Sequence, residues 1–452
     1  MTVYDLVIRG NLVLEEEVIL GEIGIVNEKI KKITDKLHSL RGKETLEFTN
    51  EYIFPGMIDV HVHCYTNPDE GFETTSLSAA VGGITSFLDM PYDNPDPITD
   101  VQRFNKKVSL LEESAVVDMG LYGTIRKING TDQIKKLAEA GAMAFKLSTF
   151  EVDEYRFPRI PDFEIIKAME KINECGLRVV FHAENEEIIK VLTEEYEQKN
   201  QVYSLAHTET RPPVSETSAV LKLLEFAYWT DVKLHIAHVS HPRTLELIEI
   251  FKIQGVSVTA ETCYNYLLLN LDDFSELGPK AKINPPLRSE ADQLGLWNYL
   301  KENKVDLISS DHSPWGYETK EPGLGNIFHS TSGLPGLEIM VPLLFDEGVL
   351  KGKITTVQFA KLMSTHPAEA FQILNKGKIS VGYDADFTII NPDATWVIDE
   401  SKFKSSTKLS PYHGEKVTGK IVQTIVRGRV VYDGENVLVD PGYGNFIHGH
   451  AK

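Results

Sequence analysis

Residues 56–63 read Gly56-Met57-Ile58-Asp59-Val60-His61-Val62-His63, and this stretch decides the fold prediction. Its apolar residues lead up to two histidines, which is typical of a buried strand that ends in polar side chains. Residues two apart in a strand point to the same face, so His61 and His63 project together. Two imidazoles on one face suit the binding of one metal ion. From this motif alone, two ordinary strand histidines remain the alternative.

The pattern of an apolar strand followed by a helix recurs along the middle of the chain. Strands are predicted at 57–63, 84–90, 119–124, 142–148, 178–184, 233–240, 256–262 and 307–313. Helices with apolar residues three and four apart are predicted at 162–175, 186–196, 216–228, 244–254 and 291–303. Eight strands alternating with helices predict an α/β protein built on a closed (β/α)8 TIM barrel. An open doubly wound sheet is the alternative, but no glycine-rich nucleotide turn follows any strand.

The two ends of the chain have a different texture. Short apolar runs broken by glycine and asparagine fill residues 3–50, and similar runs return at 385–390 and 421–431. Both ends are therefore predicted to combine in one small β-sandwich domain. The predicted division assigns 1–52 and 376–452 to this domain and its tail, and 53–375 to the barrel.

Composition limits the partners and the compartment. The 452 residues carry 46 basic and 66 acidic side chains, a formal charge of −20. Phosphate binding needs a basic face, so no nucleic-acid partner is expected. No apolar run approaches the roughly 20 residues that span a bilayer, and no signal peptide is evident, so no membrane association is expected. Three widely spaced cysteines predict reduced thiols in the cytoplasm.

Metal-capable side chains stand near the C-terminal ends of five predicted strands, where the active sites of such barrels lie. They are His61, His63, Lys146, His182, His238 and Asp311. Histidine makes up only 14 residues of the chain, so its repeated presence at one end of the strands is not expected by chance. His235 and His238 lie three apart, so a strand would point them to opposite faces. His238 is preferred because it is nearer the C-terminal end.

These motifs resemble those of the cyclic amidohydrolases, within them the hydantoinase, dihydropyrimidinase and allantoinase branch. The resemblance rests on residues 56–63, 144–146, 182–185, 238–240 and 310–314, and extends to 79–85 and 284–288. It implies a binuclear zinc centre, in which manganese or cobalt can replace zinc. The implied ligands are His61, His63 and Asp311 on one ion and His182 and His238 on the other, with carbamylated Lys146 as the bridge.

Lys146 ends an apolar run, so its side chain should enter the barrel. Burial and nearby metal cations both favour the neutral amine, which reacts with carbon dioxide to give a carbamate ligand. An ion pair with Asp311 or Glu184 in a site without metal is the alternative.

The resemblance also implies hydrolysis of a C–N bond in a cyclic amide by a metal-bridging hydroxide. Asp311 would act as the proton shuttle, first base and then acid. Thr262, Ser332 and Gly333 are the implied substrate contacts. A homotetramer or homodimer is expected. The alternative from another class is a non-catalytic dihydropyrimidinase-like scaffold, which the six filled ligand positions disfavour.

The substrate prediction depends on the loop that follows Lys146. D-type hydantoinases carry a tyrosine five residues after the metal lysine, whereas this chain has Glu151, and Tyr155 could serve only if the loop bends back. Residues 211–216 resemble allantoinases, and residues 409–446 resemble L-selective hydantoinases. A five-membered cyclic ureide is expected, either a 5-substituted hydantoin or allantoin, with dihydropyrimidine next. Dihydroorotate is disfavoured because no cationic cluster for its carboxylate is visible.

Overall fold

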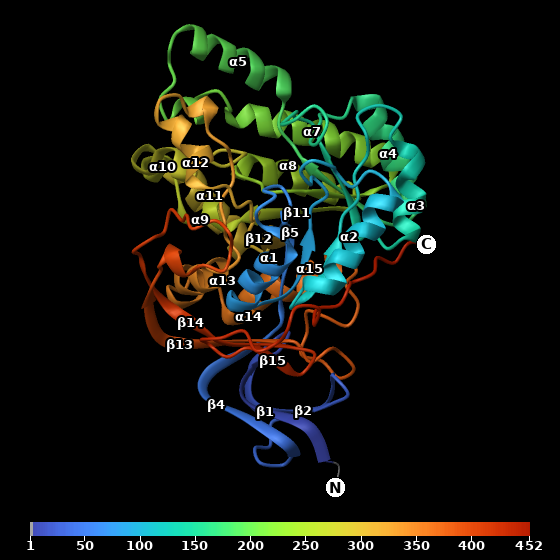
Figure 1. Ribbon diagram of the computed structural model, residues 1–452, viewed down its shortest axis with the longest axis vertical. Coiled ribbons are helices and arrows are strands. Elements are labelled where there is room, and N and C mark those ends of the chain that lie inside the picture. The colour runs from blue at the N-terminus through green and yellow to red at the C-terminus, as the bar shows by residue number, and fades with distance from the viewer. Residues whose placement is uncertain (1–2) are drawn as a thin grey trace.

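The computed structural model describes residues 3–452, and the strands of both chain ends gather at one end of the molecule (Figure 1). Seven strands form one sheet in the order β15-β14-β13-β4-β1-β2-β3. They are β1 (Val3–Val13), β2 (Val18–Val26), β3 (Lys29–Thr34), β4 (Arg41–Pro55), β13 (Phe387–Val397), β14 (Lys416–Val426) and β15 (Arg429–Tyr432). Because β4 pairs directly with β13, the prediction that both chain ends share one β structure is confirmed.

An apolar cluster joins the two halves of this sheet. Ile8 and Ile25 from the N-terminal strands pack with Phe387 and Ile425 from the C-terminal strands, and all four are buried. Burial of apolar surface is the main favourable contribution to folding, so each chain end depends on the other for its core.

Eight further strands form two parallel sheets. The first holds β5 (Met57–Val62), β6 (Ile84–Asp89) and β7 (Asp118–Leu121). The second holds β8 (Ala144–Ser148), β9 (Arg178–His182), β10 (Lys233–Ile236), β11 (Val258–Cys263) and β12 (Leu307–Ser309). Each of the eight predicted strands is found, and all eight are shorter than predicted.

The edges of the two parallel sheets are hydrogen-bonded to each other. Val62 of β5 bridges His312 just after β12, where the peptide N–H of His63 donates to the His312 carbonyl at 2.9 Å. Gly123, just after β7, bridges Phe145 of β8. Both edges of the three-stranded sheet thus meet an edge of the five-stranded sheet, which brings the C-terminal ends of their strands together.

Helices surround these strands (Figure 1). They are α1 (Gly71–Val81), α2 (Val101–Ser114), α3 (Ile134–Glu139), α4 (Asp162–Glu174), α5 (Glu186–Gln198), α6 (Ala206–Glu209), α7 (Pro213–Thr230), α8 (Pro242–Ile253), α9 (Tyr264–Leu268), α10 (Leu271–Leu277), α11 (Glu290–Lys301), α12 (Tyr317–Lys320), α13 (Met340–Leu344), α14 (Thr356–Ala360) and α15 (His366–Ala370). The five predicted helices are all present. α7 and α8 begin earlier than predicted, because each starts with a proline, whose fixed φ suits the first helical turn.

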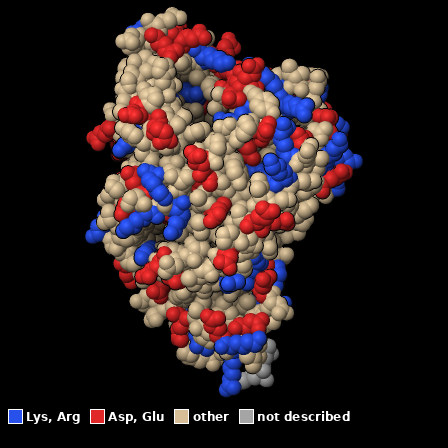
Figure 2. All heavy atoms as spheres, viewed as in Figure 1, with Lys and Arg blue, Asp and Glu red and all other residues tan. Residues whose placement is uncertain are grey.

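Within residues 3–452 no helix has both the length and the apolar character needed to cross a membrane. All three cysteines are buried free thiols. Figure 2 shows acidic and basic side chains interspersed over one face, with a hollow beside α5 in which basic side chains are visible.

Candidate active site

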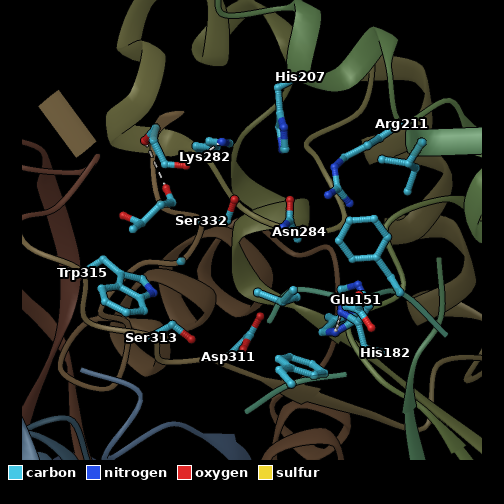
Figure 3. Close-up of a pocket in the computed structure, with 18 of the residues that line it drawn as sticks. Glu151, His182, His207, Arg211, Lys282, Asn284, Asp311, Ser313, Trp315 and Ser332 are labelled. Atoms are coloured by element: carbon cyan, nitrogen blue, oxygen red, sulfur yellow. Dashed lines mark hydrogen bonds between the residues drawn. The ribbon is translucent and has the colours of Figure 1, made fainter. Parts of the chain in front are cut away.

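A cavity of about 630 Å³ opens at the C-terminal ends of the parallel strands. The six side chains predicted as metal ligands all line it. Figure 3 shows two of them, His182 and Asp311, below residues from the surrounding loops. The structure therefore brings the six predicted ligands to one cavity.

The first group of candidate ligands consists of His61, His63 and Asp311. Their geometry is tight, since Nε2 of both histidines lies 3.3 Å from Oδ1 of Asp311. Two ligands about 2.0–2.1 Å from a tetrahedral zinc ion lie about 3.4 Å apart, so this spacing fits a shared metal ion. His61 and Asp311 also form a candidate cation site with His238, in which the ligand atoms lie within 4.8 Å of one another.

The second group consists of His182 and His238. Nδ1 of His182 lies 2.9 Å from Nε2 of His238, so two ring nitrogens face each other. Burial lowers the pKa of both imidazoles, and it lowers the pKa of His63 to about 4. Neutral imidazole is the form that binds a metal ion, so burial prepares these side chains for that role.

Lys146 lies between the two groups. Its side chain is 1% exposed, and Nζ lies 3.5 Å from Nε2 of His61. Burial lowers the pKa of its amine to about 8, although Glu261 and Asp311 act in the opposite direction. Among the described residues, no carboxylate lies within 4.0 Å of this amine, so the alternative ion pair with Asp311 or Glu184 is not formed.

Each histidine of the first group, and His182 of the second, is held by a further polar partner. Glu261 contacts Nδ1 of His61, and Glu184 accepts from Nε2 of His182 at 2.8 Å. Thr66 lies 3.1 Å from Nδ1 of His63. Such partners fix the tautomer and orientation of a metal-binding histidine.

Glu261 is the one of these partners that contacts two histidines, and sequence reasoning missed it. It is buried between His61 and His235, with Oε2 lying 3.2 Å from Nε2 of His235. Burial by itself raises the pKa of Glu261, but the two imidazoles outweigh it and hold the pKa well below its usual range. The signal in the sequence was a carboxylate inside a predicted strand, β11, where burial is costly without partners.

The argument that placed His235 and His238 on opposite faces of one strand is wrong. β10 ends at Ile236, and His238 has a φ of 39°, so strand alternation does not extend to it. His238 lines the cavity as predicted, whereas His235 lies against Glu261 outside it.

Comparison with known proteins supports one family. The sequence profile of the amidohydrolase family matches residues 52–431. The chain belongs to the amidohydrolase family.

This amidohydrolase is 32% identical to the allantoinase of Salmonella choleraesuis (strain SC-B67), over 99% of this chain and 100% of the relative. Among solved structures, the L-hydantoinase (dihydropyrimidinase) from Arthrobacter aurescens has a TM-score of 0.95 at 32% identity, covering 98% of this chain and 100% of that one. The dihydropyrimidinase from Brevibacillus agri NCHU1002 has a TM-score of 0.90 at 26% identity, covering 98% of both chains. The predicted resemblance is confirmed.

Of the three predicted substrate contacts, two line the cavity of this amidohydrolase and one does not. Ser332 and Gly333 line the cavity. Thr262 is fully buried, and its hydroxyl donates to the Val239 carbonyl at 2.8 Å, so its side chain does not reach the cavity wall.

The loop after Lys146 does not bring Tyr155 into the site. Tyr155 is 60% exposed, and its hydroxyl donates to Asp96 at 3.0 Å. Phe150, Glu151 and Phe157 line the cavity instead. The possibility that Tyr155 replaces the missing family tyrosine is therefore wrong, and aromatic rings without a hydroxyl form this wall.

The expectation that the site lacks a cationic cluster is also wrong. Arg156, Arg211 and Lys282 line the cavity. Their positions come from three separate loops, and no spacing in the sequence relates them. Arg211 and Lys282 lie in or beside segments noted for their motifs, which was the available signal.

Proposed function

We propose that this amidohydrolase opens the ring of a five-membered cyclic ureide, a hydantoin or allantoin, by hydrolysing a C–N bond. The observation that carries the proposal is the approach of His61 and His63 to Asp311 at 3.3 Å on the cavity wall. The names of the relatives, allantoinase and hydantoinase, support the same reaction class.

We infer that the site holds two zinc ions, which manganese or cobalt can replace. His61, His63 and Asp311 would hold one ion, His182 and His238 the other, and Lys146 would join them as a carbamate. When bound, the ions supply a lowered pKa of the attacking water, to about 7, and polarisation of the ring carbonyl. The low pKa of Lys146 supports the carbamate, because its formation requires the neutral amine.

Asp311 acts in this proposal as the proton shuttle. Burial raises the pKa of its carboxyl, but the neighbouring His61 and His63 outweigh burial and lower the pKa below its usual range. The carboxylate is therefore ready to accept a proton from water and to pass it to the departing ring nitrogen. Ser332 and Gly333, on the same cavity wall as Ser313 and Trp315, would orient the ring.

We further propose that the eight parallel strands close into a (β/α)8 barrel within residues 53–375. The bridges at Val62 and Gly123, which link both pairs of sheet edges, support closure. Residues 1–52 and 376–452 would form the small β-sandwich domain, with the apolar cluster shared by both chain ends as its core.

Two general properties remain proposals. Cytoplasmic location is supported by three buried free cysteines, which suit a reducing compartment. A homotetramer or homodimer is proposed by resemblance, and sedimentation showing a stable monomer at micromolar concentration would contradict it.

One comparison tests the function. The kcat/KM values for allantoin, D- and L-benzylhydantoin, dihydrouracil and dihydroorotate should favour a five-membered ring, and preference for a six-membered ring would overturn that assignment. Asp311→Ala should lose turnover by about 10²–10⁴-fold. Purified protein with less than one metal ion per chain, and no hydrolysis after metal is added, would favour a non-catalytic scaffold.

A further inference from the structure

The cavity wall opposite the candidate metal ligands carries basic side chains. Lys282, His207 and Arg211 lie across the cavity from Asp311 and His182 (Figure 3). The chain as a whole carries a formal charge of −20, so a gathering of basic side chains on one wall does not follow from its overall composition. Clefts lined by one sign of charge concentrate ligands of the opposite sign.

Lys282 is the central feature of this wall. Its side chain is 4% exposed, and Nζ donates to the carbonyl oxygens of Ile327 at 2.7 Å and Ser330 at 2.6 Å. Within residues 3–452, no carboxylate lies within 4.0 Å of this amine. An ammonium has three donors, so one remains after these two hydrogen bonds. A buried ammonium without a neighbouring anion is costly, so its position on a cavity wall suits the binding of an anionic ligand.

The other two basic side chains of this wall are already neutralised or neutral. Arg211 is paired with Glu184, and its guanidinium stacks over Phe150 at 4.5 Å. His207 donates from Nε2 to the Ile283 carbonyl at 3.0 Å, and burial holds the pKa of its imidazole well below the usual value, so it is neutral.

The acidic side chains that line the cavity outside the candidate ligands are paired or exposed. Glu151 is paired with Lys127, and Glu194 is exposed on α5, where water screens its charge. Arg156 lines the cavity on the side of His63, because it donates to the Tyr92 carbonyl at 2.9 Å and this carbonyl also accepts from Thr66, the partner of His63. It has no carboxylate within 4.0 Å among the residues described. The wall therefore offers one basic group, Lys282, that has no carboxylate partner among the residues described.

We propose that Lys282 is an anion subsite, which binds a carboxylate on the substituent of the ureide ring. This inference rests on the proposed function and narrows it to hydantoins with an acidic side chain. Arg156 adds positive potential to the same cavity. Burial, with Arg211 and Lys320 nearby, lowers the pKa of Lys282 to about 7, and a bound carboxylate would favour the charged ammonium.

A substrate series tests the subsite with the metal-loaded enzyme. Hydantoin-5-acetate carries the carboxylate, its carboxamide is a neutral analogue of similar size, and the isobutyl hydantoin is the apolar analogue. The wild type should prefer the acetate over the carboxamide by about 10- to 100-fold in kcat/KM, the range of one hydrogen bond to a charged group. This preference should fall as salt is added.

Variants assign the preference to Lys282. In Lys282→Gln the ratio of kcat/KM for hydantoin-5-acetate to kcat/KM for its carboxamide should fall to nearly one, while turnover of the isobutyl analogue changes little. Lys320→Met is the matched control, because Lys320 is a buried lysine that donates to carbonyls of the same region but does not line the cavity. It should keep the preference or raise it, because removal of the neighbouring positive charge of Lys320 favours the charged form of Lys282. Loss of the preference in Lys320→Met would contradict the assignment to Lys282.

The outcomes are distinct. Equal or better turnover of the neutral analogues by the wild type, or an unchanged preference in Lys282→Gln, would overturn the subsite and leave the proposed function intact. If Lys282→Gln does not fold, the wild-type preference for hydantoin-5-acetate over its carboxamide, and the dependence of this preference on salt, still test the subsite. Absence of turnover for every hydantoin and for allantoin would instead overturn the proposed function.

Discussion

Replacing Glu261 by glutamine should weaken metal binding while leaving the candidate ligands in place. The carboxylate contacts Nδ1 of His61 with one oxygen and lies 3.2 Å from Nε2 of His235 with the other. Each imidazole has a nitrogen facing an acceptor, which keeps Nε2 of His61 unprotonated and free to bind a metal ion.

The magnitude follows from this arrangement. Glutamine has one oxygen to accept from a ring N–H, and its amide group would face the other ring nitrogen as a second donor. One histidine therefore loses its acceptor, and both lose the negative charge. Loss of such a partner typically weakens metal binding by about 10- to 100-fold, which corresponds to about 1.4–2.7 kcal/mol.

The assay is competition for zinc between the apoprotein and a chromophoric chelator. Glu216→Gln is the matched control, since Glu216 is also a buried glutamate but is bonded to the hydroxyls of Ser240 and Thr244 and to no histidine. Its zinc affinity should match the wild type. The reasoning is refuted if Glu261→Gln binds zinc as tightly as the wild type, or if both variants lose affinity equally.

Other predictions concern two lysines. Lys146→Ala should lose metal and activity together, and added acetate or propionate should restore part of each; retention of two metal ions and near-normal activity would contradict the bridge. Burial lowers the pKa of Lys320 to about 7, below its unfolded value, so the charged form destabilises the folded state. That cost is complete below about pH 7 and disappears as the pH rises toward about 10.4. The free energy of unfolding of the wild type, relative to that of Lys320→Met, should therefore increase by about 2–3 kcal/mol between about pH 6 and about pH 9. Melting temperatures measured across this range check it, and a difference that does not change with pH would contradict it.

Elements buried on both faces could be predicted from the sequence. β9 is an apolar run that ends at His182, and all five of its residues are buried. Such runs are marked by composition alone, because parallel strands covered on both sides need apolar side chains at every position. The same holds for the helices, whose apolar residues recur three and four apart.

The basic side chains that line the cavity could not be predicted in the same way. Arg156, Arg211 and Lys282 lie on loops, and a lysine in a loop is normally exposed. Only the folded chain shows that Lys282 is buried and has neutral carbonyl oxygens as its partners. Loops carry function without a periodic signal, so dihydroorotate was disfavoured for a reason that the structure removes.

The backbone at two candidate ligands explains why strand alternation could not place them. His238 and Asp311 lie just past the ends of β10 and β12, with φ of 39° and 48°, in the left-handed region that other residues than glycine seldom adopt. Each such residue costs about 1–3 kcal/mol, which surrounding contacts must offset. At His238 the peptide N–H lies 3.3 Å from Glu261, and beyond Asp311 the His312 carbonyl accepts from His63 at 2.9 Å. Glycine at either position would relieve the backbone but remove the imidazole or carboxylate, so the strain is part of how these two side chains are directed into the cavity.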